Sequence, residues 1–176
     1  ATGELAHRNK PDQQERAARL LRSLERPLVV VPGNHDIPPW PPARILRPFA
    51  EFERHWQEVE PVYRSDGLVV CGLNSVRPWR HQGGALRSSQ LHHAARVLAE
   101  APPGALRVVA LHHHLTGAPW RSRKRPVSRR GAVLGALVDA GAELIVSGHI
   151  HQSAVGERRE FEVAAGPVHG TTVVTA

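Results

Sequence analysis

The sequence of 176 residues contains no methionine and only one cysteine. Because a translated chain starts with methionine, we expect the sequence to be part of a longer or processed protein. A single cysteine excludes an intrachain disulfide, and the apolar run at 68–73 around Cys71 predicts a buried, reduced thiol. A reduced thiol favours a cytoplasmic location. No stretch approaches the roughly 20 apolar residues that cross a bilayer, so we expect no membrane partner.

Acidic residues are outnumbered by basic ones, 16 to 23, which gives a formal net charge of +7. The basic residues are spread along the chain except at 121–130, where five arginines and Lys124 stand close together. Such a cluster suits the phosphates of a nucleic acid, but a solvated loop that leads into a helix is the commoner case. With 41% hydrophobic and 22% charged residues, the composition is that of a folded domain and excludes disordered and collagen-like chains.

Short apolar runs alternate with amphipathic stretches along the chain. Near-continuous apolar runs are typical of strands buried on both faces, and we expect strands at 28–31, 68–73, 108–111, 144–146 and 171–175. Apolar residues at helical spacing predict helices at 11–24, 43–58, 88–98 and 128–140. The expected buried face of the first helix comprises Ala17, Leu20, Leu21 and Leu24. The alternation predicts a single α/β domain over residues 1–176 with an at least partly parallel sheet.

Polar residues follow three of the predicted strands, at the point where each strand ends. Gly-Asn-His-Asp stands at 33–36, three histidines stand at 112–114, and His149 and His151 follow the strand at 144–146. The carboxyl ends of parallel strands meet at one edge of a sheet, where ligands bind. Imidazole, amide and carboxylate donors without a thiolate favour Mn, Fe or Zn in a hydrolytic site over a cysteine-type structural zinc site.

These segments, in this order, resemble the motifs of the calcineurin-like metallophosphoesterase family. Residues 30–38 and the Gly-Leu-Asn-Ser at 72–75 are similar to a bacterial branch of that family, which includes members resembling cyclic-nucleotide phosphodiesterases. The resemblance implies a four-layer α/β/β/α sandwich with a centre of two divalent metal ions, Mn, Fe or Zn. It also implies that a metal-activated water hydrolyses a phosphomonoester or phosphodiester, with a small-molecule phosphoester as the expected partner.

The resemblance assigns metal ligands among the motif residues. Asn34, His112 and His149 would ligate the second metal of the centre. His113 is the alternative to His112 as a ligand, and is otherwise expected to bind substrate. His151 would ligate the first metal.

Two catalytic roles and two departures also follow from the resemblance. His35 would contact the substrate phosphate and protonate the leaving oxygen, and Asp36 would orient His35. Glu4 stands where the family has the aspartate that bridges both metals, and its extra methylene shifts or weakens that bridge. The family's first strand carries an Asp-x-His motif with two ligands of the first metal, and the sequence starts after that point. We therefore expect a domain that lacks its first strand and stops early at its C-terminus.

The remaining ligands lead to an expectation about activity. Glu4, Asn34, His112 and His149 make a set for one ion, so we expect this chain to bind one ion better than two and to have weak or no phosphodiesterase activity. Two alternatives stay open. One is a nuclease-like member that binds nucleic acid through 121–130, and the other is a non-catalytic metal-binding relic in which Glu4 marks decay.

Overall fold

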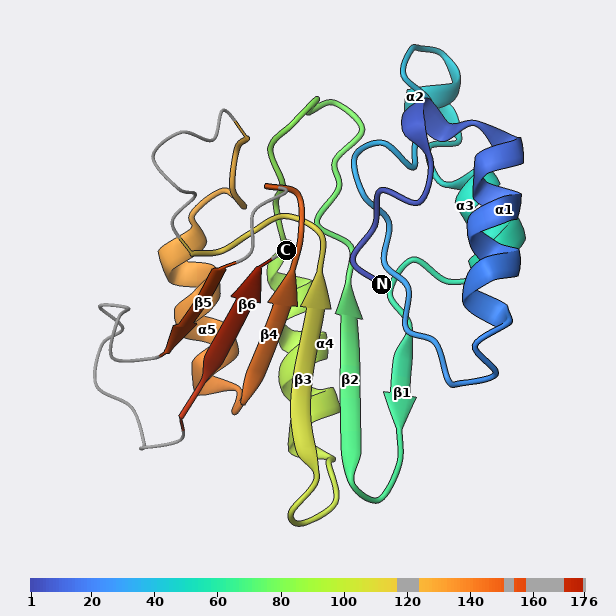
Figure 1. The fold of residues 1–176 in the computed structure, drawn as a ribbon. Coiled ribbons are helices and arrows are strands. Elements are labelled where there is room, and N and C mark those ends of the chain that lie inside the picture. Colours follow the sequence, from blue (N-terminus) through green and yellow to red (C-terminus); the bar gives the residue numbers. More distant parts are fainter. Residues whose placement is uncertain (117–123, 151–153, 158–169, 176) are drawn as a thin grey trace.

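The computed structural model describes residues 1–116, 124–150, 154–157 and 170–175. Their strands form one six-stranded sheet in the order β1-β2-β3-β4-β6-β5 (Figure 1). The strands are β1 (Val62–Arg64), β2 (Leu68–Leu73), β3 (Leu106–Leu111), β4 (Leu144–Ser147), β5 (Ala154–Glu157) and β6 (Thr172–Thr175). β2, β3, β4 and β6 are parallel, while β1 and β5 run antiparallel at the two edges. The α/β class and the partly parallel sheet are confirmed, and the described residues build this one sheet of the expected sandwich.

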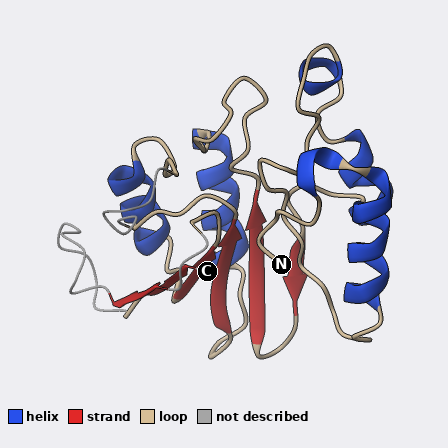
Figure 2. Cartoon of the chain, turned by 45° about the horizontal axis from the view of Figure 1, so that its top comes forward, coloured by secondary structure: helices blue, strands red, loops and turns tan. Residues whose placement is uncertain are grey.

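The helices lie in two groups (Figure 1 and Figure 2). They are η1 (His7–Asn9), α1 (Pro11–Arg22), α2 (Ala43–Leu46), α3 (Ala50–Trp56), α4 (Ser88–Ala99) and α5 (Arg130–Asp139). α4 and α5 cover one face of the sheet, whereas α1 and α3 lie beyond β1. The helix predicted at 43–58 forms as two short helices because Pro48 disfavours helical backbone at Arg47, which has φ −142° and ψ 60°. Within the described residues, no helix has the length and apolarity that a membrane span requires.

The main apolar core lies between the sheet and the face formed by α4 and α5. β2 contributes Val69, Cys71 and Leu73 to this core, every second residue, as the alternation of side chains along a strand requires. α5 contributes Leu134 and Leu137. Cys71 is fully buried, and this burial raises the pKa of its thiol to about 12. The predicted buried thiol is therefore confirmed.

The strand predicted at 28–31 is wrong, although Val30 and Val31 are buried. The segment pairs with the chain start, where the Ala1 amino group donates to the Val29 carbonyl at 2.6 Å and Val31 N–H donates to the Ala1 carbonyl at 3.1 Å. Val31 packs against β2, where a Cβ on Gly72 would lie 2.9 Å from its Cγ1. The segment 28–31 is apolar because it packs against the sheet. The sequence pattern does not distinguish such a segment from a hydrogen-bonded strand of the sheet.

The buried face of α1 also differs from the expectation. Leu20 and Leu24 are 69% and 56% exposed, whereas Gln14 and Ala18 are buried. The Gln14 amide donates to the buried carboxylate of Asp36 at 3.1 Å, and this bond turns the helix face that carries Gln14 toward the loops of the site. The helical spacing of apolar residues does not predict a buried hydrogen bond of this kind, because it considers only how apolar each helix face is.

The parallel strands deliver three polar segments to one edge of the sheet. β2 and β3 pair with Leu73 opposite Leu111, and β3 and β4 pair with Ala110 opposite Val146. The residues that follow each strand therefore leave the sheet side by side. The N–H of Gly148 donates to the carbonyl of His112 at 2.9 Å, which holds the last two of these segments together.

Candidate metal centre

Four side chains converge at this edge of the sheet. Nε2 of His112 lies 2.9 Å from Oδ1 of Asn34 and 3.0 Å from Nδ1 of His149. Oε1 of Glu4 lies 3.6 Å from that His112 nitrogen and 3.7 Å from Nδ1 of His149. The fold thus brings together the four residues that the sequence had suggested as a set for one ion.

The contacts of His112 decide which of its ring nitrogens carries the hydrogen. Nδ1 lies 2.7 Å from the Thr2 carbonyl, which only accepts, so Nδ1 donates and Nε2 presents a lone pair. That lone pair faces Oδ1 of Asn34, whose amide nitrogen donates to the His81 carbonyl at 3.4 Å. Two lone pairs at 2.9 Å repel one another unless a cation attracts both. Ligand atoms bound to one ion at about 2.0–2.2 Å lie about 3 Å apart, so the donor set fits a divalent metal ion.

Burial keeps the ring of His112 in the form that binds metal. His112 and His149 are 1% and 3% exposed. Burial lowers the pKa of His112 to about 3, and repulsion from His149 adds to this, while the bond to Thr2 and the charge of Glu4 oppose it. A neutral imidazole keeps the lone pair that coordinates a metal.

His113 and His114 extend the cluster. One ring nitrogen each of His112, His113 and His149 lie within 4.8 Å of one another. Nδ1 of His113 lies 2.8 Å from Oγ of Ser75, which also accepts the His113 backbone N–H at 3.1 Å. In the described part of the chain, Nε2 of His113 and both ring nitrogens of His114 are buried without a hydrogen-bond partner. His112 and His113 therefore both belong to the cluster, and the choice between them as ligand stays a prediction.

Close backbone approaches place the ligands. Gly3 has φ +85°, and a Cβ on it would lie 2.4 Å from the nitrogen of Gly33. A Cβ on Gly33 would lie 2.5 Å from the nitrogen of Glu4. The two segments pass at a distance that only glycines permit, which sets Glu4 beside Asn34. Glu4 and His149 have φ of 59° and 79°, in the left-handed region that is costly for residues with a side chain.

The carboxylate of Asp36 anchors the two loops that carry these ligands. Its Oδ1 accepts from the N–H of Ala6 at 2.9 Å and from the amide of Gln14 at 3.1 Å, and its Oδ2 accepts from the N–H of Gly33 at 2.8 Å. Burial raises the pKa of Asp36 to about 6, although the backbone hydrogen bonds oppose this rise. The expected role of Asp36 in orienting His35 stays a prediction.

His35 lies at a hollow of about 190 Å³ that is also lined by Asn34 and His81. Its ring stacks on that of His7, with centroids 5.3 Å apart and an interplanar angle of 22°. Burial lowers the pKa of His35, while the carboxylate of Glu4 opposes the shift. A chemical group bound at Asn34 would therefore share this hollow with the imidazole of His35.

Some of the sequence expectations fall outside the described residues. These are His151, the expected ligand of the first metal, and Arg121 and Arg123 of the basic cluster. Two contacts of the site were missed by the sequence analysis. Ser75 stands at the end of a predicted strand, which was a usable signal, whereas Thr2 acts through its backbone carbonyl and leaves no signal in the sequence.

Comparison with known proteins adds independent findings. The family model described as calcineurin-like phosphoesterase matches residues 1–153. The chain is 26% identical over 175 residues to the serine/threonine-protein phosphatase CPPED1 of Bos taurus, covering 94% of this chain and 55% of that protein. It is 27% identical over 178 residues to the 3',5'-cyclic adenosine monophosphate phosphodiesterase CpdA of Haemophilus influenzae, covering 95% of this chain and 59% of that protein. The chain thus spans little more than half the length of these relatives.

Proposed function

Because the chain belongs to the calcineurin-like phosphoesterase family, we propose that it is a metal-dependent phosphoesterase that hydrolyses phosphomonoesters or phosphodiesters. The observation that carries this proposal is the convergence of Glu4, Asn34, His112 and His149 on one point, with the lone pairs of His112 and Asn34 facing each other. The names of both relatives describe phosphoester hydrolases, one acting on a protein and one on a cyclic nucleotide. They support the reaction class and leave the substrate open.

The four converging residues would hold one divalent ion, with Mn, Fe or Zn as the ions that suit this donor set. When bound, such an ion polarises a phosphoryl oxygen and lowers the pKa of a water molecule. Glu4 supplies the only carboxylate among the four donors, so its charge partly neutralises the ion. The Thr2 carbonyl holds the ring of His112 in the tautomer that ligates. We propose that the chain binds this ion more tightly than a second one and that its turnover is weak.

The residues beside the metal set have proposed roles of their own. His35 would donate a proton to the leaving oxygen, because its ring lines the hollow that opens at Asn34. His113 would bind substrate or serve as a further ligand, since its buried Nε2 has no hydrogen-bond partner in the described part of the chain. Asp36 would act as a positioning residue, because it holds the two ligand loops against each other.

A combined measurement of metal binding and turnover tests this function. The chain is freed of metal and titrated with Mn²⁺ in a calorimeter, and hydrolysis of bis(p-nitrophenyl) phosphate is followed on the same sample. We expect one tight equivalent and slow turnover, with both lost in His112→Ala and both kept in His92→Ala, a control that removes an exposed histidine of α4. Two tight equivalents with fast turnover would contradict the single-ion proposal. Absence of saturable metal binding would contradict the function.

Two coarser features of the protein are part of the same proposal. We propose that residues 1–176 form a single domain, because one apolar cluster joins β2, β3, β4 and β6 to α4 and α5. We also propose a cytoplasmic location, which the free and buried thiol of Cys71 supports. Fractionation of cells that express the tagged protein tests the location, and recovery in the membrane or extracellular fraction would contradict it.

A further inference from the structure

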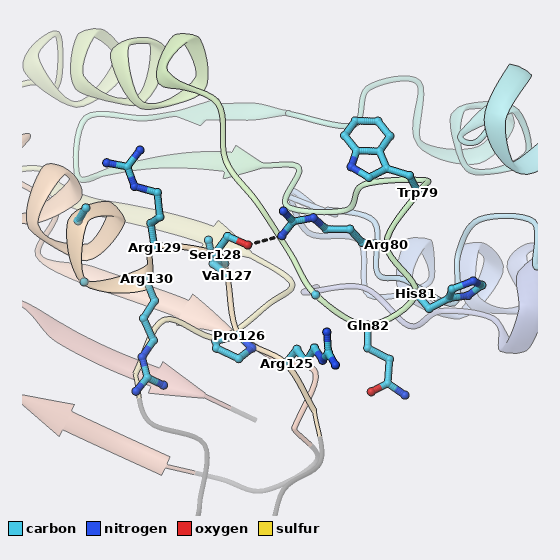
Figure 3. A pocket seen from close by; sticks show the side chains of 13 residues that line it. Trp79, Arg80, His81, Gln82, Arg125, Pro126, Val127, Ser128, Arg129 and Arg130 are labelled. Atoms are coloured by element: carbon cyan, nitrogen blue, oxygen red, sulfur yellow. Dashed lines mark hydrogen bonds between the residues drawn. The ribbon is translucent and has the colours of Figure 1, made fainter.

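A second hollow, of about 1090 Å³, opens between residues 79–83 and 125–132 (Figure 3). Four arginines line it, namely Arg80, Arg125, Arg129 and Arg130, and none of the described lining residues is acidic. Guanidinium groups that gather around one space repel each other, and an anion in that space relieves the repulsion through charge-assisted hydrogen bonds. The lining therefore indicates an anionic occupant.

The two walls of this hollow are joined before any ligand binds. Arg80 donates to the hydroxyl of Ser128 and, at 3.4 Å, to the carbonyl of Gly84 (Figure 3). The N–H of Ser128 donates to the same Gly84 carbonyl at 2.8 Å, and Gly84 forms a parallel bridge with Val127. The N–H of Val127 donates to the carbonyl of His114 at 3.1 Å. These bonds tie the backbone walls of the hollow to the histidine cluster, so the walls need little ordering when a ligand binds.

The start of α5 adds backbone donors to the same space. Arg130, Gly131 and Ala132 form the first residues of this ten-residue helix, and all three line the hollow. The first turn contains no acidic residue, and the N-cap residue Arg129 makes no capping hydrogen bond with its side chain. The amide groups at a helix start attract anions. These amides therefore reinforce the charge of the four arginines.

The two hollows adjoin at His81. His81 lines both hollows, and its backbone carbonyl accepts a hydrogen bond from the side-chain amide of Asn34, one of the proposed metal ligands. A molecule whose reacting phosphate lies by Asn34 and His35 would extend past His81 toward Arg80 and Arg125. A substrate with one phosphate would leave these arginines without a counter-charge.

We propose that the arginine-lined hollow holds a second phosphate group of the substrate. The substrate class is then a small organic phosphoester that carries at least two phosphates, an inference that rests on the proposed phosphoesterase function. A small molecule fits better than a nucleic acid, because the four described arginines line one hollow rather than a stripe that follows a strand.

Paired ligands that differ by one phosphate test this inference. The metal-free chain is titrated with adenosine 5′-monophosphate and with adenosine 3′,5′-bisphosphate, so that binding is read independently of turnover. The variant Arg125→Gln/Arg130→Gln removes two charges from the hollow, and Arg16→Gln/Arg26→Gln removes two exposed charges elsewhere as the matched control. We expect the bisphosphate to bind at least about tenfold tighter than the monophosphate. This preference should fall to about twofold in the hollow variant and persist in the control.

Four results would overturn the inference. Equal affinity of the unaltered chain for both nucleotides would show that the hollow recognises no second phosphate. An equal loss of preference in the control would assign the effect to net charge. Tighter binding of a twelve-nucleotide single strand, with a steep salt dependence that the hollow variant loses, would make the partner a nucleic acid. Hydrolysis of bis(p-nitrophenyl) phosphate by the Mn²⁺-loaded chain without any bisphosphate preference would refute this inference and leave the proposed function standing.

Discussion

The carboxylate of Asp36 is the point where removal of one side chain should disturb the site most. In Asp36→Ala, the N–H groups of Ala6 and Gly33 and the amide of Gln14 lose their common acceptor inside the protein. Each buried donor left without a partner costs about 1–3 kcal/mol. Water that enters the space left by the side chain accepts hydrogen bonds from some of these donors, so we expect a loss of about 3–5 kcal/mol in the free energy of unfolding. For a chain of this length that corresponds to a fall of about 6–20 °C in Tm.

Urea unfolding with and without Mn²⁺ measures this effect. Asp66→Ala, which removes an exposed aspartate from the turn between β1 and β2, is the matched control and should change stability by less than about 0.5 kcal/mol. Folded Asp36→Ala should also bind Mn²⁺ more weakly, because Glu4 and Asn34 are carried by the two loops that Asp36 joins. A loss below about 1 kcal/mol with unchanged Mn²⁺ affinity would refute the assignment of Asp36 as the anchor of these loops.

Four further outcomes follow from the packing. Gly84→Ala would place a Cβ 2.5 Å from a ring carbon of His113, and we expect a loss of about 1–3 kcal/mol in urea unfolding. Gly135→Ala, at a helix position with open space around it, should instead gain up to about 1 kcal/mol. Cys71 should resist iodoacetamide at pH 9 until urea unfolds the chain, because burial raises its pKa to about 12 and keeps the thiol protonated; fast labelling of the folded chain would contradict this. Leu20→Gln should change the free energy of unfolding by less than about 0.5 kcal/mol, since Leu20 is 69% exposed. A larger loss would show that Leu20 is buried, as the sequence had predicted.

The residues that the sequence identified share one property, namely their place directly after an apolar run. His112 and His149 could be placed at one sheet edge because they follow neighbouring parallel strands. Asn34 and Glu4 came from the order of the motifs, since the strand expected before Asn34 does not form. The contacts that position them could not be predicted in the same way. Asp36 accepts from backbone amides, and such bonds depend on the path of the chain and not on the type of residue that donates.

The errors have a related physical cause. The apolar run at 28–31 packs against β2 and therefore has the composition of a strand. It does not form the ladder of backbone hydrogen bonds that would make it a strand of the sheet. In α1 the buried residues are Gln14, which donates to Asp36, and Ala18, so the face turned inward carries a polar side chain while Leu20 stays exposed. Periodicity reports how apolar each face is, and it contains no information about a buried carboxylate that needs a donor.

The position of a bound ion tests the central claim most directly. Crystals of the chain soaked in Mn²⁺ and measured at the manganese absorption edge would locate the ion by its anomalous scattering. We expect one strong peak within about 2.0–2.3 Å of Oε1 of Glu4, Oδ1 of Asn34, Nε2 of His112 and Nδ1 of His149. A peak that is bound by other residues, or a site between these four atoms that stays empty at saturating Mn²⁺, would contradict the account.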